Sequence, residues 1–432
     1  MSDLIQPKLL KGFRDSLPDQ EIRKKEIVNR LESVFELYGF VPIDTPVLEY
    51  AEVLLGKGGG ETDKQVYRFL DHGERDVAMR FDLTVPFARF MAGHLQELYL
   101  PFKRYHTSKV WRGENTQRGR FREFIQSDFD IVGVDTPSAD FEILQVMKTS
   151  LETIGIDRFT IHFSHRGLFN DFLQKENISD KYTEILRIVD KLAKIGRNEV
   201  LSQLSAKTNP EKSGRILEFI RPEEDSNKTL EKIASFVPPD SEALQRIRSL
   251  FALLEETGQT QRFYFNPSIT RGLDYYTGLV YETFLTEAES IGSVCSGGRY
   301  NDLASLYTKE QLPGVGSSIG LDRLLTALDS LGIEQERTYT TDAIILMMDE
   351  PLLGFYHNLA GRLRENGLAC EVYPEKKKLA KQFQYAEKKG IPFAVICGED
   401  ERKTGTYTLK DLNRRENFEK LSFEDVVRNI SS

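Results

Sequence analysis

One stretch of the sequence, RGLDYYTGLVYE at residues 271–282, carries side chains that suit ligand chemistry better than sheet packing. Its composition is that of a strand, yet an arginine, an aspartate and two tyrosines stand close together. A buried guanidinium without an anionic partner is very costly. Arg271 therefore predicts a nearby anion, either a local carboxylate such as Asp274 or a phosphate of a ligand.

A second segment, residues 103–122, is strongly basic within an acidic chain. It holds seven Lys and Arg residues against one acid, Glu114, whereas the whole chain has a net charge of −9. Its arginines are interleaved with the aromatic residues Trp111, Phe121 and Phe124. Guanidinium and aromatic planes together suit a ligand that combines a phosphate with a base. A solvated charged loop is the alternative interpretation.

A third group of polar side chains lies in REFIQSDFDIVG, residues 122–133. Because side chains alternate across a strand, residues 124, 126, 128 and 130 share one face. Phe, Gln, Asp and Asp make a poor core stripe, and they suit the floor of a pocket. The alternative is a set of polar positions on a half-exposed strand.

The elements that would position these residues follow from the hydrophobic periodicity. Residues 21–38 have helical spacing and lead into VPIDTPVLEY, whose prolines suit the edge or the start of a strand. Residues 77–90 predict a strand, a turn and a helix, and residues 98–132 predict two antiparallel strands joined by the basic segment. Residues 295–307 predict a turn leading into a helix, and residues 314–328 predict a strand or loop feeding a helix.

Changes in composition divide the chain. Residues 168–260 are rich in Lys and Glu and helical in pattern, so we predict an inserted helical subdomain. Residues 340–432 alternate between β and α patterns and carry 15 basic and 15 acidic residues. This alternation predicts a small parallel or mixed α/β domain.

The bulk composition narrows the class of protein. The 432 residues suffice for two or three domains, and 40% hydrophobic with 29% charged residues is typical of a globular chain. No apolar run approaches the ~18 residues of a membrane span, and the first twenty residues lack the apolar core of a secretory signal. Three separated cysteines and six unclustered histidines predict a reducing, cytoplasmic compartment and no metal site built by the protein.

The motifs occur in an order that resembles a known family. A helix leading to a strand with Pro46, the strand–loop–strand WRGE…RGRFREF, and GLDR ending at Arg323 resemble motifs 1, 2 and 3 of class II aminoacyl-tRNA synthetases. RGLDYYTGLVYE and SGGRY, with RFDLTVP and REFIQSDFD, resemble motifs specific to the histidyl-tRNA synthetase family. KQFQYAEKKGIPFAVICGEDE resembles that family's anticodon-binding domain, so the resemblance covers essentially the whole chain.

The resemblance implies an α/β fold with an α+β catalytic core, in which a class II antiparallel sheet is flanked by helices. It places motifs 1 and 2 in a first part of the core at residues 1–167. The histidine motifs and motif 3 fall in a second part at 261–332, after the helical insertion at 168–260. A C-terminal α/β anticodon-binding domain follows at 340–432.

The implied activity is that of a histidine–tRNA ligase. Such an enzyme activates L-histidine with ATP, which binds with Mg²⁺ as a substrate complex, to give histidyl-adenylate and pyrophosphate. It then transfers histidine to the 3′ end of tRNA(His). The attacking carboxylate is already ionised, so the site must supply positioning and positive charge. The resemblance also implies a homodimer formed through motif 1 and no tightly bound cofactor.

By resemblance, ATP lies among residues of motifs 2 and 3. Arg112 would hold the α-phosphate, and Arg120 with Arg323 the β- and γ-phosphates. Phe124 would stack on adenine, and Glu114 would face the adenine amino group.

The implied histidine pocket must attract a cationic amino group and read an imidazole. Asp82 and Thr84 would bind the amino group with Gln126 nearby, while Asp130 and Tyr276 would read the imidazole nitrogens. An apolar pocket would not reject amino acids of similar size as strongly. The full implied histidine set is Asp82, Leu83, Thr84, Arg112, Gln126, Asp130, Arg271, Tyr275 and Tyr276.

Two further assignments follow from the resemblance. Arg271 would stand against the α-phosphate, where many class II relatives use a metal ion, and would share the catalytic role with Arg112. Gln117, in ENTQRGR, occupies the place where bacterial relatives contact the extra 5′ guanosine of their tRNA.

Two other functions fit parts of the same pattern. The histidine-sensing regulatory subunit of ATP phosphoribosyltransferase resembles the catalytic core, but such proteins typically lack the anticodon domain and lose motif residues. A class II synthetase for proline, glycine or threonine is the other alternative. Tyr275, Tyr276 and Asp130 count against it.

Overall fold

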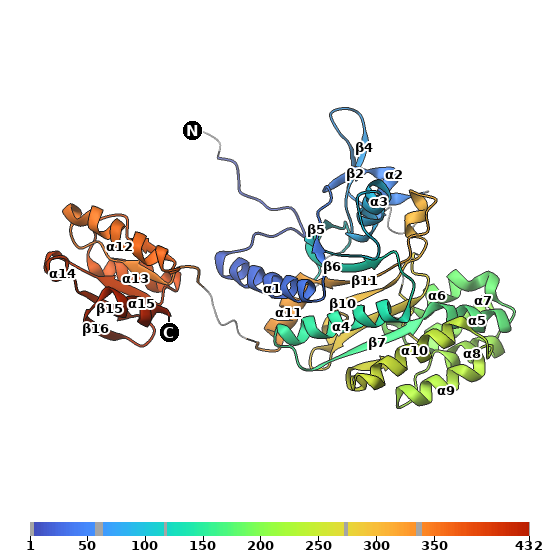
Figure 1. The fold of residues 1–432 in the computed structure, drawn as a ribbon. Helices are drawn as coiled ribbons and strands as arrows, with labels where there is room; N and C mark the ends of the chain where they lie inside the picture. The colour runs from blue at the N-terminus through green and yellow to red at the C-terminus, as the bar shows by residue number, and fades with distance from the viewer. Residues whose placement is uncertain (1–3, 57–63, 116–118, 272–274, 334–338, 432) are drawn as a thin grey trace. The chain divides into compact units, whose positions relative to one another are not determined.

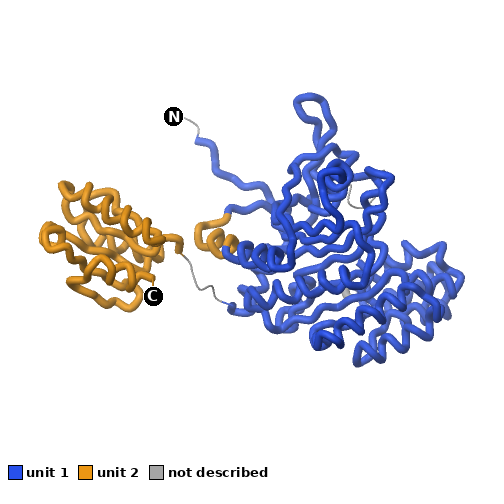
Figure 2. Tube along the Cα trace, in the orientation of Figure 1, with its two compact units in different colours: residues 1–15, 26–334 blue, residues 16–25, 335–432 orange. Residues whose placement is uncertain are grey.

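The computed structural model describes residues 4–56, 64–115, 119–271, 275–333 and 339–431. The chain divides into two compact units, residues 1–15 with 26–334 and residues 16–25 with 335–432 (Figure 2). Each unit has its own main sheet and its own hydrophobic clusters.

The chain up to residue 165 contributes most of one half of the main sheet. Its elements are α1 (Pro18–Leu37), β1 (Val41–Pro42), β2 (Leu48–Tyr50), α2 (Ala51–Leu55), β3 (Arg68–Leu70), β4 (Asp76–Met79), α3 (Thr84–His94), β5 (Phe102–Trp111), β6 (Glu123–Val132), α4 (Pro137–Thr153) and β7 (Phe159–His165) (Figure 1). The strand, turn and helix predicted for residues 77–90 are confirmed as β4, a turn and α3.

The next part of the chain is helical and then returns to the sheet. Its elements are α5 (Arg166–Lys175), α6 (Tyr182–Val189), α7 (Leu192–Lys207), α8 (Pro210–Phe219), α9 (Ser226–Phe236), α10 (Glu242–Glu256), β8 (Phe263–Phe265), β9 (Leu279–Leu285), β10 (Cys295–Arg299), β11 (Gly314–Gly320) and α11 (Leu321–Ser330). Helices α5 to α10 lie together beside the sheet, in green to yellow in Figure 1. The helical pattern predicted for this segment is confirmed.

The main sheet of the first unit has eight strands in the order β1-β5-β6-β11-β10-β9-β7-β8. Its outer pairs, β1 with β5 and β7 with β8, are parallel, and the pairs between them are antiparallel. β1 contains Pro42 and lies at the edge of the sheet, as this proline predicts, because proline cannot donate to a strand ladder. The two antiparallel strands predicted within residues 98–132 are confirmed as β5 and β6.

Alternate side chains of β6 point to opposite faces of the sheet, one facing the hydrophobic core and the other facing a cavity. Phe129 and Ile131 belong to a large buried cluster that also contains Phe35 of α1 and Leu324 of α11. Asp130, which lies between Phe129 and Ile131 in the strand, belongs to a different surface and lines a cavity. The helices on one face of the sheet thus leave the alternate positions of β6 free for polar chemistry.

A smaller antiparallel sheet in the order β2-β4-β3 supports the start of α3. The turn between β4 and α3 carries Arg80 and Asp82, which are both buried. The guanidinium of Arg80 donates to the backbone oxygen atoms of Thr45 at 2.5 Å and Lys109 at 3.0 Å. Arg80 therefore fastens the turn from which Asp82 projects.

The prediction of a turn leading into a helix at residues 295–307 is wrong for its first five residues. Residues 295–299 form β10, which is followed only by a short 3-10 helix at Leu303–Leu306. The glycines that suggest a turn instead allow close packing within the sheet. A Cβ atom at Gly297 would lie 2.1 Å from the backbone oxygen of Gly316 on β11.

The second unit is a mixed α/β domain, as its alternating pattern predicts. Its elements are β12 (Ala343–Ile345), α12 (Leu353–Glu365), β13 (Cys370–Val372), α13 (Leu379–Lys389), β14 (Phe393–Ile396), α14 (Glu399–Thr404), β15 (Tyr407–Asp411), β16 (Glu416–Leu421) and α15 (Phe423–Ser431). The sheet order is β13-β12-β14-β15-β16, with the first three strands parallel and the others antiparallel. Across the described residues, no helix is both long enough and apolar enough to cross a membrane.

Candidate active site

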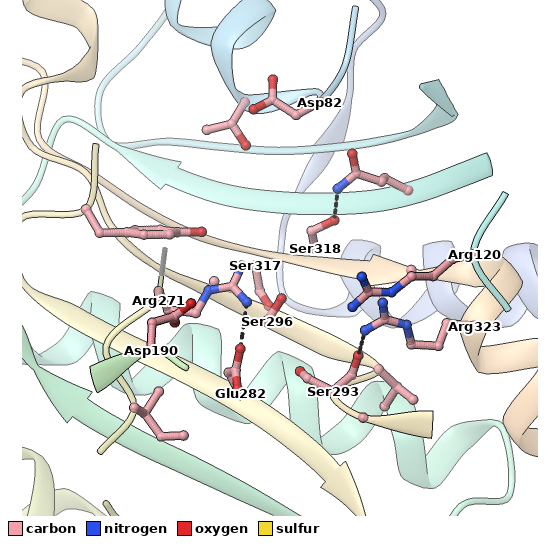
Figure 3. Close-up of a pocket in the computed structure, with 18 of the residues that line it drawn as sticks. Asp82, Arg120, Asp190, Arg271, Glu282, Ser293, Ser296, Ser317, Ser318 and Arg323 are labelled. Carbon is pink, nitrogen blue, oxygen red and sulfur yellow. Dashed lines mark hydrogen bonds and ion pairs between the residues drawn. The ribbon is translucent and has the colours of Figure 1, made fainter. Parts of the chain in front are cut away.

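A cavity of about 740 Å³ opens in the first unit, against the polar positions of β6 and β11 (Figure 3). Its volume lies in the range of sites that enclose small ligands. The predicted residues that line it are Asp82, Thr84, Arg112, Glu114, Arg120, Phe124, Gln126, Asp130, Arg271, Tyr275, Tyr276 and Arg323. The fold thus gathers most of the predicted set around one hollow.

One side of the cavity is cationic. Arg323, in the first turn of α11, donates to the backbone oxygen of Ser293 at 2.5 Å. Burial, and then the charge of Arg120, lowers the pKa of Arg323 to about 10. Arg120 lies beside Arg323 in Figure 3, and its guanidinium is 4.0 Å from the Glu114 carboxylate. Neighbouring guanidinium groups are stabilised by an anion between them, so this side suits a polyphosphate.

Arg112 is held close to an aromatic ring. Its Nε donates to the backbone oxygen of Phe81 at 2.8 Å, and its guanidinium carbon lies 5.1 Å from the centre of the Phe124 ring. The backbone contact restrains the guanidinium next to an aromatic face. This is an arrangement in which a phosphate and a stacked base can be bound together.

Another side of the cavity presents a buried carboxylate, Asp82, away from the two arginines in Figure 3. Its Oδ1 accepts from the backbone N–H of Val85 at 3.1 Å, in the first turn of α3. Its Oδ2 is buried and has no hydrogen-bond partner among the residues that the structure describes. Burial raises the pKa of Asp82 to about 6. A carboxylate in this condition, with Thr84 beside it, suits the ammonium group of a ligand.

Asp130 lies on the floor of the cavity but already has protein partners. The guanidinium of Arg104, which is fully buried, lies 2.7 Å from its Oδ2, and the Tyr300 hydroxyl donates to its Oδ1. Gly316 makes room for this carboxylate, because a Cβ there would lie 1.8 Å from Oδ1. Asp130 therefore acts together with two groups that the sequence analysis does not assign to the site. Arg104 also corrects the interpretation of the basic segment, since it belongs to a buried strand.

Two other residues of the same strand face differ in position. Gln126 lines the cavity and donates from Nε2 to the Ser318 hydroxyl at 2.6 Å. Asp128 is buried but does not line the cavity, which the shared strand face alone does not predict. Burial raises the pKa of Asp128 to about 7.

Tyr275 and Tyr276 line the cavity as a pair whose ring centres are 4.7 Å apart. The Tyr276 ring lies 5.8 Å from the Arg271 guanidinium carbon. Burial raises the pKa of Tyr275 well above its ordinary value, so its phenol stays neutral and can both donate and accept. Two phenol hydroxyls in the same lining as the Asp130 carboxylate suit the recognition of an imidazole.

Arg271 has an anionic partner, as predicted, and that partner is Glu282. The Arg271 NH1 atom lies 2.8 Å from Oε1 of Glu282 on β9 (Figure 3). Asp274, the local carboxylate named from the sequence, lies outside the described residues. Glu282 closes the stretch RGLDYYTGLVYE, so a search for acids along that strand would have found it. Within the described part of the chain, the Nε atom of Arg271 is buried without a hydrogen-bond partner.

The helical segment also contributes to the cavity wall, through Asp190 and Lys194 near the junction of α6 and α7. Burial, together with the charge of Glu282, raises the pKa of Asp190. Figure 3 shows Asp190 near Arg271. These residues had no signal in the sequence, because their position depends on how the helices pack beside the sheet.

Two predicted residues are not placed at the cavity. Leu83 is fully buried outside the lining, and its backbone oxygen accepts from Arg104 at 3.4 Å. Gln117 lies outside the described residues.

Comparisons with known proteins identify the family. A family model described as histidyl-tRNA synthetase matches residues 12–324, and one described as anticodon binding domain matches residues 342–432. A protein of Treponema denticola named histidine–tRNA ligase is 52% identical over 406 residues, which cover 93% of this chain and 91% of that protein. A protein of Wolinella succinogenes with the same name is 45% identical and covers 95% of this chain and 94% of its own.

Solved structures agree with this family. A histidyl-tRNA synthetase from a Nostoc species superposes with a TM-score of 0.89 at 34% identity, covering 99% of both chains. A Bacillus halodurans structure described as an ATP phosphoribosyltransferase regulatory subunit/histidyl-tRNA synthetase has a TM-score of 0.76 at 24% identity and covers 91% of this chain and 99% of its own. That second likeness shows the fold alone. The matches to both domains, together with the whole-length relatives, show that the chain belongs to the histidyl-tRNA synthetase family.

Proposed function

We propose that the cavity carries out histidine activation with ATP, the first of the two steps by which histidine–tRNA ligases charge tRNA. The ligase activity itself follows from membership of the family. The observation that supports this site for it is the charge pattern of one cavity, with buried Asp82 on one side and Arg120 with Arg323 on another. An amino acid and a nucleoside triphosphate carry the charges that complement this pattern.

In this proposal the histidine substrate is held at both ends. Its ammonium group binds Asp82 and Thr84, and its imidazole lies between Tyr276 and Asp130, with Tyr275 against the ring. The burial of these groups favours histidine over an isostere without ring nitrogens, because such a ligand would leave buried polar atoms unpaired.

ATP lies along the cationic side. Arg120 and Arg323 hold the outer phosphates, Arg112 holds the α-phosphate, Phe124 stacks on adenine and Glu114 accepts from its amino group. ATP enters as its Mg²⁺ complex, in which the ion bridges phosphate oxygens and belongs to the substrate. The proposal assigns no protein ligand to that ion, and the described residues contain no group of three or more His, Cys, Asp or Glu that could hold one.

The chemical step takes place between the two substrates. A carboxylate oxygen of histidine attacks the α-phosphorus, and the bond from that phosphorus to the pyrophosphate oxygen breaks. Arg112 and Arg271 stabilise the charge that spreads over the α-phosphate oxygens in the transition state. Because Glu282 already orients Arg271, little reorganisation of this guanidinium is needed.

The test is ATP–pyrophosphate exchange with purified protein and each amino acid in turn. We expect exchange that depends on histidine and not on proline, glycine or threonine. The absence of histidine-dependent exchange would contradict the proposal and favour a histidine-sensing protein.

We also propose that the second unit binds the anticodon of tRNA(His) and that the chain works as a cytoplasmic homodimer. The anticodon-domain match supports the first part. Exposed apolar side chains on the small sheet, Leu48, Tyr50, Phe69 and Leu70, support a second copy packed near motif 1. All three cysteines are free and buried, as suits a reducing compartment. Sedimentation velocity tests the dimer, and a monomer at micromolar concentration would contradict it.

A further inference from the structure

Arg166, the first residue of helix α5, contacts the stretch that carries Arg271 and Tyr276. Its side chain is 6% exposed and does not line the cavity. Its Nε donates to the backbone oxygen of Thr270 at 3.2 Å, NH1 to that of Tyr276 at 2.7 Å, and NH2 to that of Arg271 at 2.5 Å. One guanidinium therefore joins three carbonyl groups of one short segment.

The backbone of Arg166 adds a fourth contact in the same direction. Its N–H donates to the backbone oxygen of Gly278 at 2.9 Å. Arg166 contacts the backbone oxygen atoms of Thr270 and Arg271, and it also contacts those of Tyr276 and Gly278. Arg166 thus restrains the backbone at residues 270–271 and again at residues 276–278.

The backbone of Arg271 explains why such restraint is needed. Its φ angle is +56°, in the left-handed region that is unfavourable for a residue with a Cβ. A conformation of this kind persists only where surrounding contacts impose it. The hydrogen bond from Arg166 to the Arg271 carbonyl is such a contact. It restrains the backbone of Arg271, whose side chain extends into the cavity and reaches Glu282.

We propose that Arg166 is a positioning residue for histidine activation, which sets the places of the Arg271 guanidinium and the Tyr276 ring from outside the cavity. This inference rests on the proposed function of the cavity. The planar guanidinium suits the task because its five N–H groups point in fixed directions, whereas a lysine donates from a single nitrogen atom. Arg166 is also the first residue of α5, so it links the helical segment to the catalytic arginine.

The test compares Arg166→Lys with wild type in histidine-dependent ATP–pyrophosphate exchange. A lysine keeps the charge but cannot reach three carbonyl groups in one geometry. We expect kcat to fall about 100-fold, as for a displacement of reacting groups by about 1 Å, and the KM for ATP to stay unchanged. The KM for histidine should rise, because Tyr276 moves as well.

A double-mutant cycle separates positioning from general stability. In an Arg271→Ala background, Arg166→Lys should lower kcat by less than about 3-fold, because the group that it positions is gone. The rise in the KM for histidine should remain, since Tyr276 is still present. Additive losses in kcat would overturn the inference, and so would an Arg166→Lys enzyme with the kcat of wild type.

The matched control is Arg246→Lys. Arg246 of α10 also attaches the helical segment to the rest of the unit, but through Asp135 and Asp140 at 2.8 and 2.7 Å. We expect this variant to keep the exchange kcat of wild type. An equal loss in both variants would show that any loosening of the helices lowers activity, and would overturn the specific role of Arg166.

Folding is checked for each variant by circular dichroism at the assay temperature. If Arg166→Lys does not fold, Arg166→Gln replaces it in the same cycle, since an amide can still donate to a carbonyl. Failure of both to fold would make Arg166 a structural residue and overturn the inference. If the wild-type enzyme shows no histidine-dependent exchange, the proposed function itself is overturned. If the wild type is active but the kcat losses of the Arg166 and Arg271 variants are additive, only this inference is overturned.

Discussion

At the scale of single residues, the site depends on charges kept away from water. Asp82 shows the cost, because burial raises its pKa to about 6 while one oxygen has no partner among the described residues. Asp130 shows how such a cost is met, because Arg104 and Tyr300 both contact its carboxylate. Asp82, which lines the cavity and has no ion pair to a cation within 4 Å among the described residues, is the carboxylate to which the proposal assigns a charged ligand.

Asp82 should therefore reduce stability while it promotes binding. Between about pH 4 and pH 6 its native carboxyl is protonated and its unfolded carboxyl is ionised, because burial raises the native pKa. The native state then binds more protons, so the contribution of Asp82 to the free energy of unfolding falls as pH rises through this window. At pH 7 that loss is complete, and Asp82→Asn should raise the melting temperature or leave it unchanged.

The same variant should bind histidine about 10- to 100-fold more weakly at pH 7, because a charged hydrogen bond to the ammonium group is lost. Calorimetric titration and thermal unfolding between pH 4 and pH 7 measure the two effects. Comparison with wild type at each pH cancels the titration of the substrate imidazole. A variant that binds histidine as tightly as wild type would contradict the role of Asp82.

At the scale of elements, close packing of β6, β10 and β11 shapes the floor of the site. Gly316 of β11 faces Asp130 of β6, and Gly297 of β10 lies against the backbone of Gly316. The glycines give the carboxylate its space, so strand pairing and ligand recognition depend on the same positions. A sheet with ordinary side chains here would fill the cavity floor.

Gly316→Ala tests this dependence. Its Cβ would lie 1.8 Å from the Asp130 carboxylate and 2.9 Å from the Phe129 backbone oxygen, so either that carboxylate must leave its partners or β11 must shift. We expect a loss of about 1–3 kcal/mol in the free energy of unfolding by urea titration, and loss of most histidine-dependent exchange. The control is Gly214→Ala in α8, where a Cβ meets nothing within 4 Å. That variant should gain about 0.5–1 kcal/mol and keep its exchange activity, and equal behaviour of the two would contradict the argument.

Elements were predictable where one local rule decided them. The helix before Val41, the paired strands β5 and β6 and the alternating second unit followed from periodicity and proline. Residues 295–307 were not predictable in this way, because Gly297 and Gly298 mark a tight strand contact that local rules interpret as a turn. Local rules also fail for Arg104. A count of charges assigns it to a basic loop, but in the fold it is buried and pairs with Asp130.

At the scale of the whole molecule, the proposed function assigns histidine activation to the first unit and anticodon binding to the second. Residues 340–432 are neutral in sum, but Lys376, Lys377 and Lys378 lie together in a hollow with Met347 and Met348. This hollow follows the ends of the parallel strands β12 and β13. The carboxyl ends of parallel strands are where open α/β sheets bind ligands, and three lysines there suit a phosphate backbone.

Replacement of the three lysines by alanine should separate the two steps of the reaction. We expect the KM for tRNA(His) in aminoacylation to rise at least 10-fold and its salt dependence to weaken, since counterion release falls with the number of phosphate contacts. Exchange without tRNA should keep its rate. Lys403→Ala, an exposed lysine of α14, is the control. An unchanged KM for tRNA in the triple variant would exclude this hollow from the tRNA interface.

The sequence by itself determined the family, the class of fold and the kinds of side chain that line the cavity. Arg271, Tyr275 and Tyr276 stand in a motif whose order along the chain is specific, and residue type alone sets charge and donor pattern. Only the tertiary structure decided which groups complete the site. Glu282 pairs with Arg271, and Tyr300 and Arg104 contact Asp130. Arg166 holds the backbone at Arg271 and Tyr276. The reason is physical. A buried charge or carbonyl needs a partner within about 3 Å, and strand register and helix packing decide which distant residue comes that close.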